Sequence, residues 1–409
     1  MLQALSKGLN GVSLGSLWLA ILLMPIVALA GGLGFQVTVG VIGLATLLAW
    51  LVDKSQADYL KSSWPFCFIA FAAWAWISTL WSPYEGHNTF VLFGLLVLLL
   101  FVPLIFLRLS DDAKTPLRWT VISMGLVGVA LLLFDSVSGF ALSFWADPVP
   151  PGGDPELRRG NAEMNVGRGQ VSYIQLLWPV AGLLMLKLKR GWILACLCFL
   201  GLALSAYFNN LSIVIPTLII ALSVAALAWK YSRLGLIAAF TIAMASLLFA
   251  PLLGILSGYM DEEMMRRLPL SWEHRVRMWS YTWELIQQAP LIGHGFDSSR
   301  VFDELTFRAP DGRDITVLSM HPHNIGLQIW LETGVIGVVL AVCFLTMLMK
   351  SVLKTCVGPI RAFTAAGLIT TVATSGAVTI GVWQHWWLAL IILAGSLIML
   401  IPVKSCAGA

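Results

Sequence analysis

The sequence predicts an all-α polytopic membrane protein that crosses the bilayer about twelve times, and three observations lead to this fold class. Of the 409 residues, 58% are hydrophobic and only 11% are charged, whereas an ordinary soluble domain has roughly 25% charged residues. The mean hydropathy is +0.86. The hydrophobic residues are gathered in long runs, and about 20 apolar residues span a bilayer as a helix. These observations exclude a soluble or disordered chain, and the small net charge of +4 gives no reason to expect a nucleic-acid partner.

Twelve apolar runs follow one another along the chain. They cover residues 14–30, 33–52, 64–81, 89–107, 118–141, 171–188, 191–208, 211–229, 234–254, 324–349, 360–380 and 384–402. The first run, with Lys7 before it and Ala28-Leu29-Ala30 at its end, also has the pattern of a signal peptide. Because eleven more runs follow, we expect it to remain as the first span. Residues 1–409 should therefore form a single membrane domain.

The distribution of Lys and Arg predicts the orientation of the chain. Connections on one side contain fifteen of these residues, among them Lys54, Lys61 and Lys404, whereas the four short connections opposite (31–32, 82–88, 209–210 and 381–384) contain none. Basic residues mark the cytoplasmic side. Both termini are therefore expected in the cytoplasm, with two long loops outside, at 142–170 and 255–323.

The larger outer loop, residues 255–323, is expected to be structured. Asp261-Glu262-Glu263 followed by Arg266-Arg267 matches the dipole of a short helix, which Pro269 ends. Ser271 is the predicted N-cap of a second helix. That helix carries one apolar stripe, made by Trp272, Val276, Trp279, Trp283 and Ile286. Packing of the stripe would hold Arg275 and Arg277 rigidly at the membrane surface, where a guanidinium suits a phosphate or diphosphate. A solvated or phospholipid-facing charge is the alternative.

The loop closes with Met320-His321-Pro322-His323-Asn324. Asn324 is a natural N-cap for the tenth span, which places His323 at the membrane surface. A neutral histidine there can accept a proton from a hydroxyl. An inert structural pair is one alternative. A metal site formed by His321 and His323 with Asp303, Asp311 or Asp314 is the other.

The spans are nearly free of charge, and acidic residues are almost absent from them. Asp135 and Glu332 are the exceptions, and both lie toward the outer ends. An ion-coupled transporter needs such groups near the membrane centre, so the chemistry is expected at the outer surface. Glu332 is expected either to contact substrate or to pair with an inward-facing polar group. Trp383, Gln384, His385, Trp386 and Trp387 predict an aromatic belt at the outer interface, with sugar stacking as the alternative.

Together these motifs resemble the O-antigen ligase and O-antigen polymerase superfamily. The resemblance rests on Arg275-x-x-x-Trp279, on Pro290-Leu291-Ile292-Gly293-His294-Gly295, and on His323-Asn324 followed after nine residues by Gly334-x-x-Gly337. The motifs cover about 65 residues, and the layout of about twelve spans with the largest outer loop between the ninth and tenth extends the match. The resemblance implies the GT-C-like architecture of the ligases.

The resemblance implies a glycosyltransferase of the bacterial inner membrane with a periplasmic active site. Ligases of the family move a glycan from undecaprenyl diphosphate to a hydroxyl of lipid A–core, with inversion and with neither metal nor other cofactor. Polymerases use a second lipid-linked glycan as acceptor. By position, His323 matches the likely base and Arg275 a likely diphosphate contact. We further place Arg277, His321, Asn324 and Glu332 around the substrates.

One part of the family pattern is missing. Many members carry a Ser-Arg or Thr-Arg pair in the short outer turn between the seventh and eighth spans, whereas residues 204–211 here contain no arginine. Arg168, at the outer entrance of the sixth span, is the expected replacement, with Arg158 and Arg159 as further candidates.

The leading hypothesis is therefore an O-antigen ligase-type enzyme. A polymerase of O-antigen or exopolysaccharide repeat units is the first alternative, and an oligosaccharyltransferase acting on protein Ser or Thr is the next. A transporter or flippase for a lipid-linked sugar is the alternative from another class. The polyprenyl tail of the donor would need an apolar cleft, which Trp178 and Trp330 could line.

Overall fold

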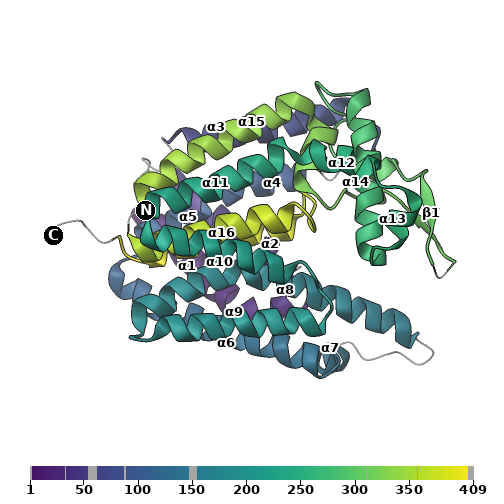
Figure 1. The fold of residues 1–409 in the computed structure, drawn as a ribbon. Coiled ribbons are helices and arrows are strands. Elements are labelled where there is room, and N and C mark those ends of the chain that lie inside the picture. Colours follow the sequence, from purple (N-terminus) through teal and green to yellow (C-terminus); the bar gives the residue numbers. More distant parts are fainter. Residues whose placement is uncertain are drawn as a thin grey trace.

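The computed structural model describes residues 2–32, 34–53, 62–86, 89–146, 154–310, 312–356 and 358–403. Long helices run side by side in a bundle, and a polar insertion covers one end of it (Figure 1). The start of α1 and the end of the last helix both lie at the opposite end. Lys54, Lys61 and Lys404, which contribute to the predicted orientation, lie outside the described residues.

Eight helical segments of the described chain are long and apolar enough to cross a membrane. They are α1 (Leu2–Leu29), α2 (Phe35–Val52), α3 (Ser63–Ile77) with η2 (Ser78–Leu80), α4 (Thr89–Leu99) with α5 (Val102–Arg108), α6 (Asp111–Val137), α8 (Pro155–Lys187), α9 (Gly191–Phe208) and α15 (Ile325–Thr355). A ninth is the pair α11 (Ser232–Leu248) and α12 (Ala250–Gly258), if this pair, bent by 48°, is one span. The chain is thus an all-α, multi-pass membrane protein.

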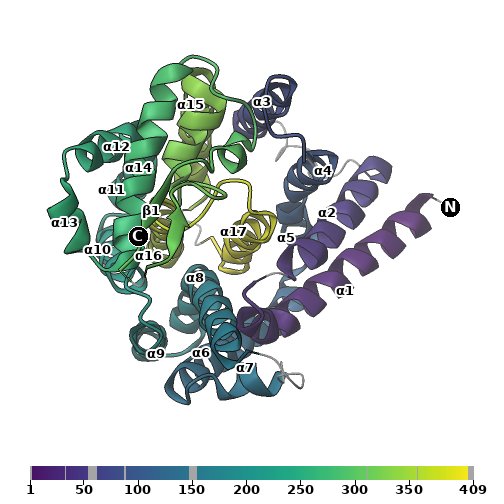
Figure 2. The same cartoon turned by 90° about the vertical axis from the view of Figure 1, so that its right-hand side faces the viewer.

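The remaining bundle helices are shorter or less apolar. They are α7 (Ala141–Ala146), α10 (Val214–Lys230), α16 (Pro359–Gly376), and α17 (His385–Leu397) with η4 (Ile398–Leu400). All twelve predicted runs contain helix, although fewer than twelve pass as spans by length and apolarity among the described residues. Seen from the insertion, α17 lies near the centre, inside a ring of the other helices (Figure 2). It packs against α2, α5, α8 and α16, so its first residues lie in the middle of the polar end.

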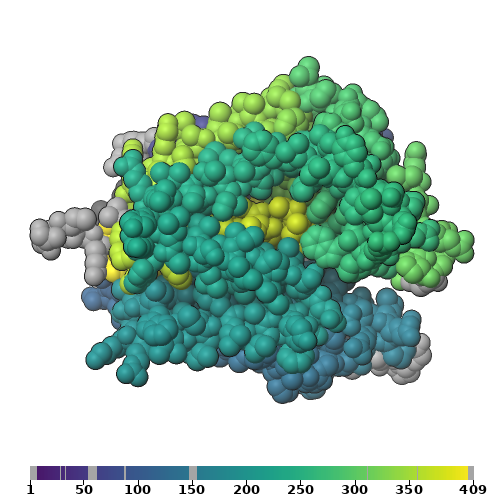
Figure 3. Space-filling model, viewed as in Figure 1, coloured from purple at the N-terminus to yellow at the C-terminus, as the bar shows by residue number. Residues whose placement is uncertain are grey.

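The first long outer loop is shorter than the predicted 142–170. Residues 155–170 form the first half of α8. The helix begins early because Asp154 accepts a hydrogen bond from the Glu156 backbone N–H (2.8 Å) and Pro155 takes the first helical position. Residues 147–153 lie outside the described residues. The start of α8 projects beyond the bundle beside the insertion, and the surface between the two is hollowed (Figure 3).

The insertion begins a few residues later than the predicted 255–323, because α12 continues to Gly258; we define it as residues 259–324. It contains α13 (Glu262–Arg266), α14 (Leu270–Gln288), η3 (Ser298–Val301), and the antiparallel strands β1 (Thr306–Arg308) and β2 (Asp314–Thr316). The predicted cap of α14 is wrong. The Trp272 and Glu273 N–H groups donate to the Pro269 carbonyl (2.8 and 3.0 Å), so Ser271 lies inside the first turn.

The apolar stripe of α14 is confirmed. Val276, Trp279 and Ile286 are buried, and Trp272 and Trp283 pack against the same cluster. This apolar cluster, which is separate from the core of the bundle, joins α14 to α15 and to the sheet. The insertion is therefore fixed to the bundle through a packed apolar interface.

Candidate active site at the polar end of the bundle

One short connection, residues 377–384 between α16 and α17, binds Arg275 and His323, the two residues that the sequence motifs favour most as catalytic. The Thr379 carbonyl lies 2.8 Å from Nδ1 of His323. The adjacent Val378 carbonyl accepts a hydrogen bond from Nε of Arg275 (2.9 Å). His323 and Arg275 are separated by the rest of the insertion in sequence, and two neighbouring carbonyls bring them together.

The geometry around His323 fixes its tautomer. A carbonyl oxygen can only accept, so Nδ1 carries the proton and donates it to Thr379. Nε2 has no hydrogen-bond partner among the described residues and presents its lone pair. Burial, together with the nearby charge of Arg275, lowers the pKa of His323 to about 4. Because of this low pKa, the ring is a neutral acceptor over the physiological pH range. The backbone of His323 has φ of 48°, in the left-handed region.

Arg275 is half-buried on the first turns of α14. Its Nη1 donates to the Ser271 carbonyl (2.6 Å), and the guanidinium lies 5.6 Å from the centre of the Trp272 ring. Nη2 has no partner among the described residues. Burial lowers the pKa of Arg275, but an arginine remains charged at neutral pH. The site thus contains a fixed cation with donors to spare.

His321 lies against His323 and supports it. Nδ1 of His321 accepts from the His323 backbone N–H (3.2 Å), the ring centroids are 4.4 Å apart, and Nε2 lies 2.9 Å from the Gln384 side-chain amide. Burial lowers the pKa of His321 to about 3. Both ring nitrogens are thus engaged. Within the described ranges no group of three or more metal-ligating side chains occurs; Asp311, one candidate ligand, lies outside those ranges.

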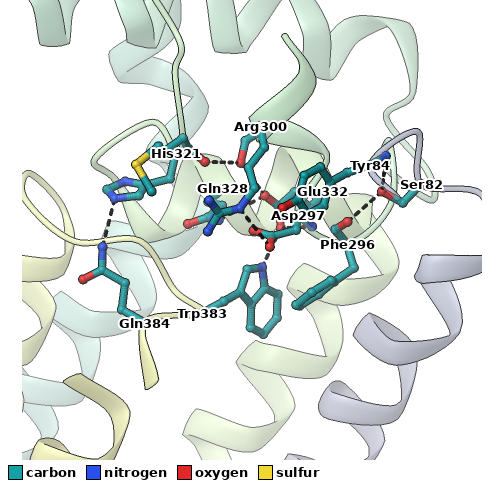
Figure 4. A network of polar contacts seen from close by, with 12 residues as sticks. Ser82, Tyr84, Phe296, Asp297, Arg300, His321, Gln328, Glu332, Trp383 and Gln384 are labelled. Atoms are coloured by element: carbon teal, nitrogen blue, oxygen red, sulfur yellow. Dashed lines mark hydrogen bonds and ion pairs between the residues drawn. The ribbon is translucent and has the colours of Figure 1, made fainter. Parts of the chain in front are cut away.

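Of the two alternatives expected for Glu332, the structure favours a pair with inward-facing polar groups over the substrate contact. Its side chain has 0% exposure and accepts four hydrogen bonds, from the Asp297 N–H (3.0 Å), Ser299 Oγ (2.8 Å), Gln328 Nε2 (3.0 Å) and Trp383 Nε1 (2.5 Å) (Figure 4). It therefore pairs with inward-facing polar groups and ties η3 and the connection 377–384 to α15. Because Trp383 and Trp387 are buried, they do not form the predicted interfacial belt.

Asn324 is the N-cap of α15, as predicted. Its Oδ1 accepts from the Leu327 N–H (2.9 Å), and the side chain is fully buried. Direct contact with a substrate is therefore not supported. Asn324 instead fixes the start of the helix that follows His323.

The two glycine motifs form one structural unit. α15 breaks at Gly334, where φ is 62°. The break frees the Leu331 and Glu332 carbonyls, which accept from the N–H groups of His294 (2.8 Å) and Gly295 (2.9 Å). Beyond it, the freed N–H of Val335 donates to the Pro290 carbonyl (2.9 Å). Gly293 lies so close that a Cβ would be 2.4 Å from the Glu332 carbonyl carbon, so these positions need glycine.

Arg277 is not available for a substrate. It forms a bidentate pair with Glu262 (2.8 and 2.7 Å) and also binds Glu273 (2.8 Å), and its guanidinium lies over the Phe307 ring. These hydrogen bonds raise the pKa of Arg277 and lower that of Glu262. Because protein carboxylates occupy the fork, Arg277 fixes α13 to α14 rather than binding substrate.

The three arginines of α8 differ in their surroundings. Arg158 donates to the Phe144 carbonyl and stacks on the Phe144 ring, and Arg159 pairs with Glu163 in solvent, so both have local partners. Arg168 is half-buried against Gly31, and its guanidinium has no hydrogen bond or ion pair in the described part of the chain. The adjacent Gly32 lies against Trp386, so Arg168 flanks the start of α17.

Arg300 is a site residue that the sequence motifs do not single out. This residue of η3 pairs with Asp297 (2.9 Å), its side chain is 34% exposed, and its charge lowers the pKa of His321. Figure 4 shows Arg300 near His321 and Glu332. Each histidine of the pair thus has an arginine nearby, Arg300 for His321 and Arg275 for His323. Its position in the predicted loop directly after the Gly-x-Gly turn was a usable signal. The roles of Val378 and Thr379 could not be predicted from the sequence, because only their backbone carbonyls contact Arg275 and His323.

Comparison with known proteins confirms the resemblance. Residues 175–342 match a family model described as O-Antigen ligase. Proteins named "putative polysaccharide ligase" are similar in Rickettsia prowazekii (31% identity over 117 residues), Rickettsia typhi (30% over 117) and Rickettsia bellii (32% over 118). Each match covers 28% of this chain and 29% of the relative. No solved structure matches the chain.

Proposed function

We propose that this chain, a multi-pass bacterial membrane protein with an O-antigen ligase domain at residues 175–342, transfers a glycan from undecaprenyl diphosphate to a lipid A–core hydroxyl at the periplasmic face of the inner membrane. One observation carries the proposal. Neighbouring carbonyls at 378 and 379 hold Arg275 and His323 side by side, so that a cation with free donors lies beside an imidazole with a free lone pair.

The chemistry follows from these two groups. The acceptor hydroxyl oxygen attacks the anomeric carbon from the face opposite the diphosphate, and its proton passes to Nε2 of His323. The bond between the anomeric carbon and the diphosphate oxygen breaks, and the diphosphate leaves with the electron pair. Arg275 stabilises this developing charge. A histidine with so low a pKa is a weak base, so proton transfer should follow glycosidic bond breaking, when the hydroxyl has become more acidic.

Arg300 is a better second contact for the diphosphate than Arg277. Its charge lowers the pKa of His321, as the charge of Arg275 lowers the pKa of His323, and Asp297 is its one ion-pair partner among the described residues. Asp297→Asn provides a test because the two possible roles predict opposite results. If Arg300 binds the donor, loss of its competing carboxylate lowers the KM for donor, whereas Arg300→Gln raises it. If Arg300 only holds Asp297, both variants lose activity alike.

The surroundings of the site suit a lipid-linked donor. An apolar cavity of about 540 Å³ lies between α14, α15 and the bend of α11 and α12, and Phe249, Trp283, Ile286 and Trp330 contribute to its walls. We assign it to part of the polyprenyl chain. Trp178, the other tryptophan considered for this role, is fully buried and donates to Thr371 Oγ1 (2.8 Å), so it belongs to the bundle core.

The decisive experiment is a transfer assay on purified protein in nanodiscs, with undecaprenyl-diphosphate glycan in the presence or absence of lipid A–core. His323→Ala tests the base, and His294→Asn is the matched control, because His294 lies in the same insertion and binds the Leu285 carbonyl (2.8 Å). A product that needs both lipid A–core and His323 supports a ligase. Longer lipid-linked chains formed without the core would indicate a polymerase. Full activity of His323→Ala would refute the proposed chemistry.

A further inference from the structure

At the end of the bundle opposite the insertion, a cavity of about 610 Å³ opens between the start of α11 and the end of α15. Arg233, Lys350 and Lys354 contribute three positive charges to its walls, and Ser232 adds a hydroxyl group. Leu236 and Leu353 form an apolar part of the lining. The cavity is thus cationic with an apolar wall.

The protein supplies no counter-charge through the helices that build this cavity. From residue 164 to 260, and from 333 to 409, the sequence contains no Asp or Glu. These ranges include α10, α11, α16 and the part of α15 beyond Gly334, and α10 and α16 pack against α11. In the part of the chain that the structure describes, none of the three cations forms an ion pair. Within the described ranges, the cluster therefore has no carboxylate partner.

Lys350 and Lys354 also repel each other, because no carboxylate of the described residues pairs with them. Lys350 and Lys354 are four residues apart on one helix, so their charges lie on the same face. Like charges at this spacing repel each other weakly, and a bound anion would remove that repulsion. Such an arrangement is expected where an anion from outside completes the site.

We propose that this cavity binds the phosphate headgroup of an anionic phospholipid. The ends of membrane-spanning helices lie at the depth of the lipid phosphates, and basic pockets between such helices on the cytoplasmic side are suited to acidic headgroups. The three cations and Ser232 would hold the phosphate, and Leu236 and Leu353 would contact the start of an acyl chain. The lipid would then join α11 to α15, two helices that enter and leave the insertion.

The test compares protein in phosphatidylcholine nanodiscs with protein in nanodiscs containing phosphatidylglycerol or cardiolipin. Anionic lipid should raise the Tm of the wild type. Native mass spectrometry should show lipid affinity falling roughly 30-fold in Lys350→Gln/Lys354→Gln, because each basic residue near a membrane surface adds about a factor of five. Lys350→Arg/Lys354→Arg keeps the charge and should retain binding.

The control variant is Lys189→Gln/Arg190→Gln, which removes two exposed cations at the same end of the bundle but outside the cavity. It should bind lipid like the wild type. Equal losses in both double variants would overturn the proposal in favour of general surface attraction. Stabilisation by inorganic phosphate or glycerol phosphate in phosphatidylcholine, equal to that by anionic lipid, would also overturn it. None of these readouts depends on glycan transfer.

Discussion

The low pKa of His323 predicts an unusual pH profile for glycan transfer. The perturbation is a decrease of pH from 7 to 4, and the proposed base works only while its ring is neutral. Burial and the nearby Arg275 hold the pKa at about 4. At pH 5, such a ring is about 90% neutral, whereas a histidine with the ordinary pKa of 6.5 would be about 3% neutral. We therefore expect nearly full activity at pH 5 and half-activity near pH 4.

The same shift affects stability in a defined direction. The pKa of His323 in the folded state lies below its value in the unfolded state. The contribution of the neutral ring to the free energy of unfolding is therefore fully present above about pH 6.5 and is lost as the pH falls toward 4. This contribution is about 3 kcal/mol. Loss of activity at low pH must therefore be separated from unfolding, which tryptophan fluorescence reports in the same samples.

The assay is kcat/KM for donor in nanodiscs across this range, because that ratio reports the free enzyme. The diphosphate diester keeps both charges over this range, so the donor should not contribute to the profile. The His294→Asn control should reproduce the wild-type profile. A wild-type midpoint near pH 6.5 in folded protein, or an unchanged profile in His323→Ala, would refute the reasoning.

Four further predictions concern the surroundings of the base. Arg275→Lys should raise the KM for donor at least about tenfold, because an ammonium cannot bind two carbonyls and a diphosphate in one plane; an unchanged KM would contradict this. Arg277→Ala should destabilise the protein by about 3–5 kcal/mol, because Glu273 is left buried and unpaired. The control Arg267→Ala removes an exposed ion pair and should cost less than about 1 kcal/mol. Equal melting temperatures of the two variants would contradict this difference. Glu332→Gln should lower kcat more than it changes KM, because its amide nitrogen would face two donors at a cost of about 1–3 kcal/mol; a change in KM alone would argue for direct substrate contact. Chelation with EDTA should leave transfer intact, and activity restored only by a divalent ion would favour a His321–His323 metal site.

Much of the fold follows from local patterns in the sequence. The twelve apolar runs locate helices because burial in lipid requires intrahelical hydrogen bonds along the whole span. The cap at Asn324 and the stripe of α14 were equally local and are confirmed. The early start of α8 was missed because its first turns are polar, although Asp154-Pro155 was a start signal.

The site was predictable only in part. His323 and Arg275 emerged from residue type and motif, but their contact with residues 378 and 379 depends on backbone groups that any side chain would supply. Arg277 resembled Arg275 in sequence, and only its two carboxylate partners distinguish it. Glu332 was ambiguous because the four donors that surround it come from three separate segments.

The interlocking of the Pro290–Gly295 turn with the break at Gly334 limits how this protein can be engineered. Since each segment supplies the missing hydrogen-bond partners of the other, a chimera joined between them would pair a turn from one parent with a break from the other. Splice points should therefore lie before residue 290 and after residue 336. Residues 290–336, which are the second part of the insertion and the first turns of α15, have to be exchanged as one cassette, even though one part is a loop and the other belongs to a span.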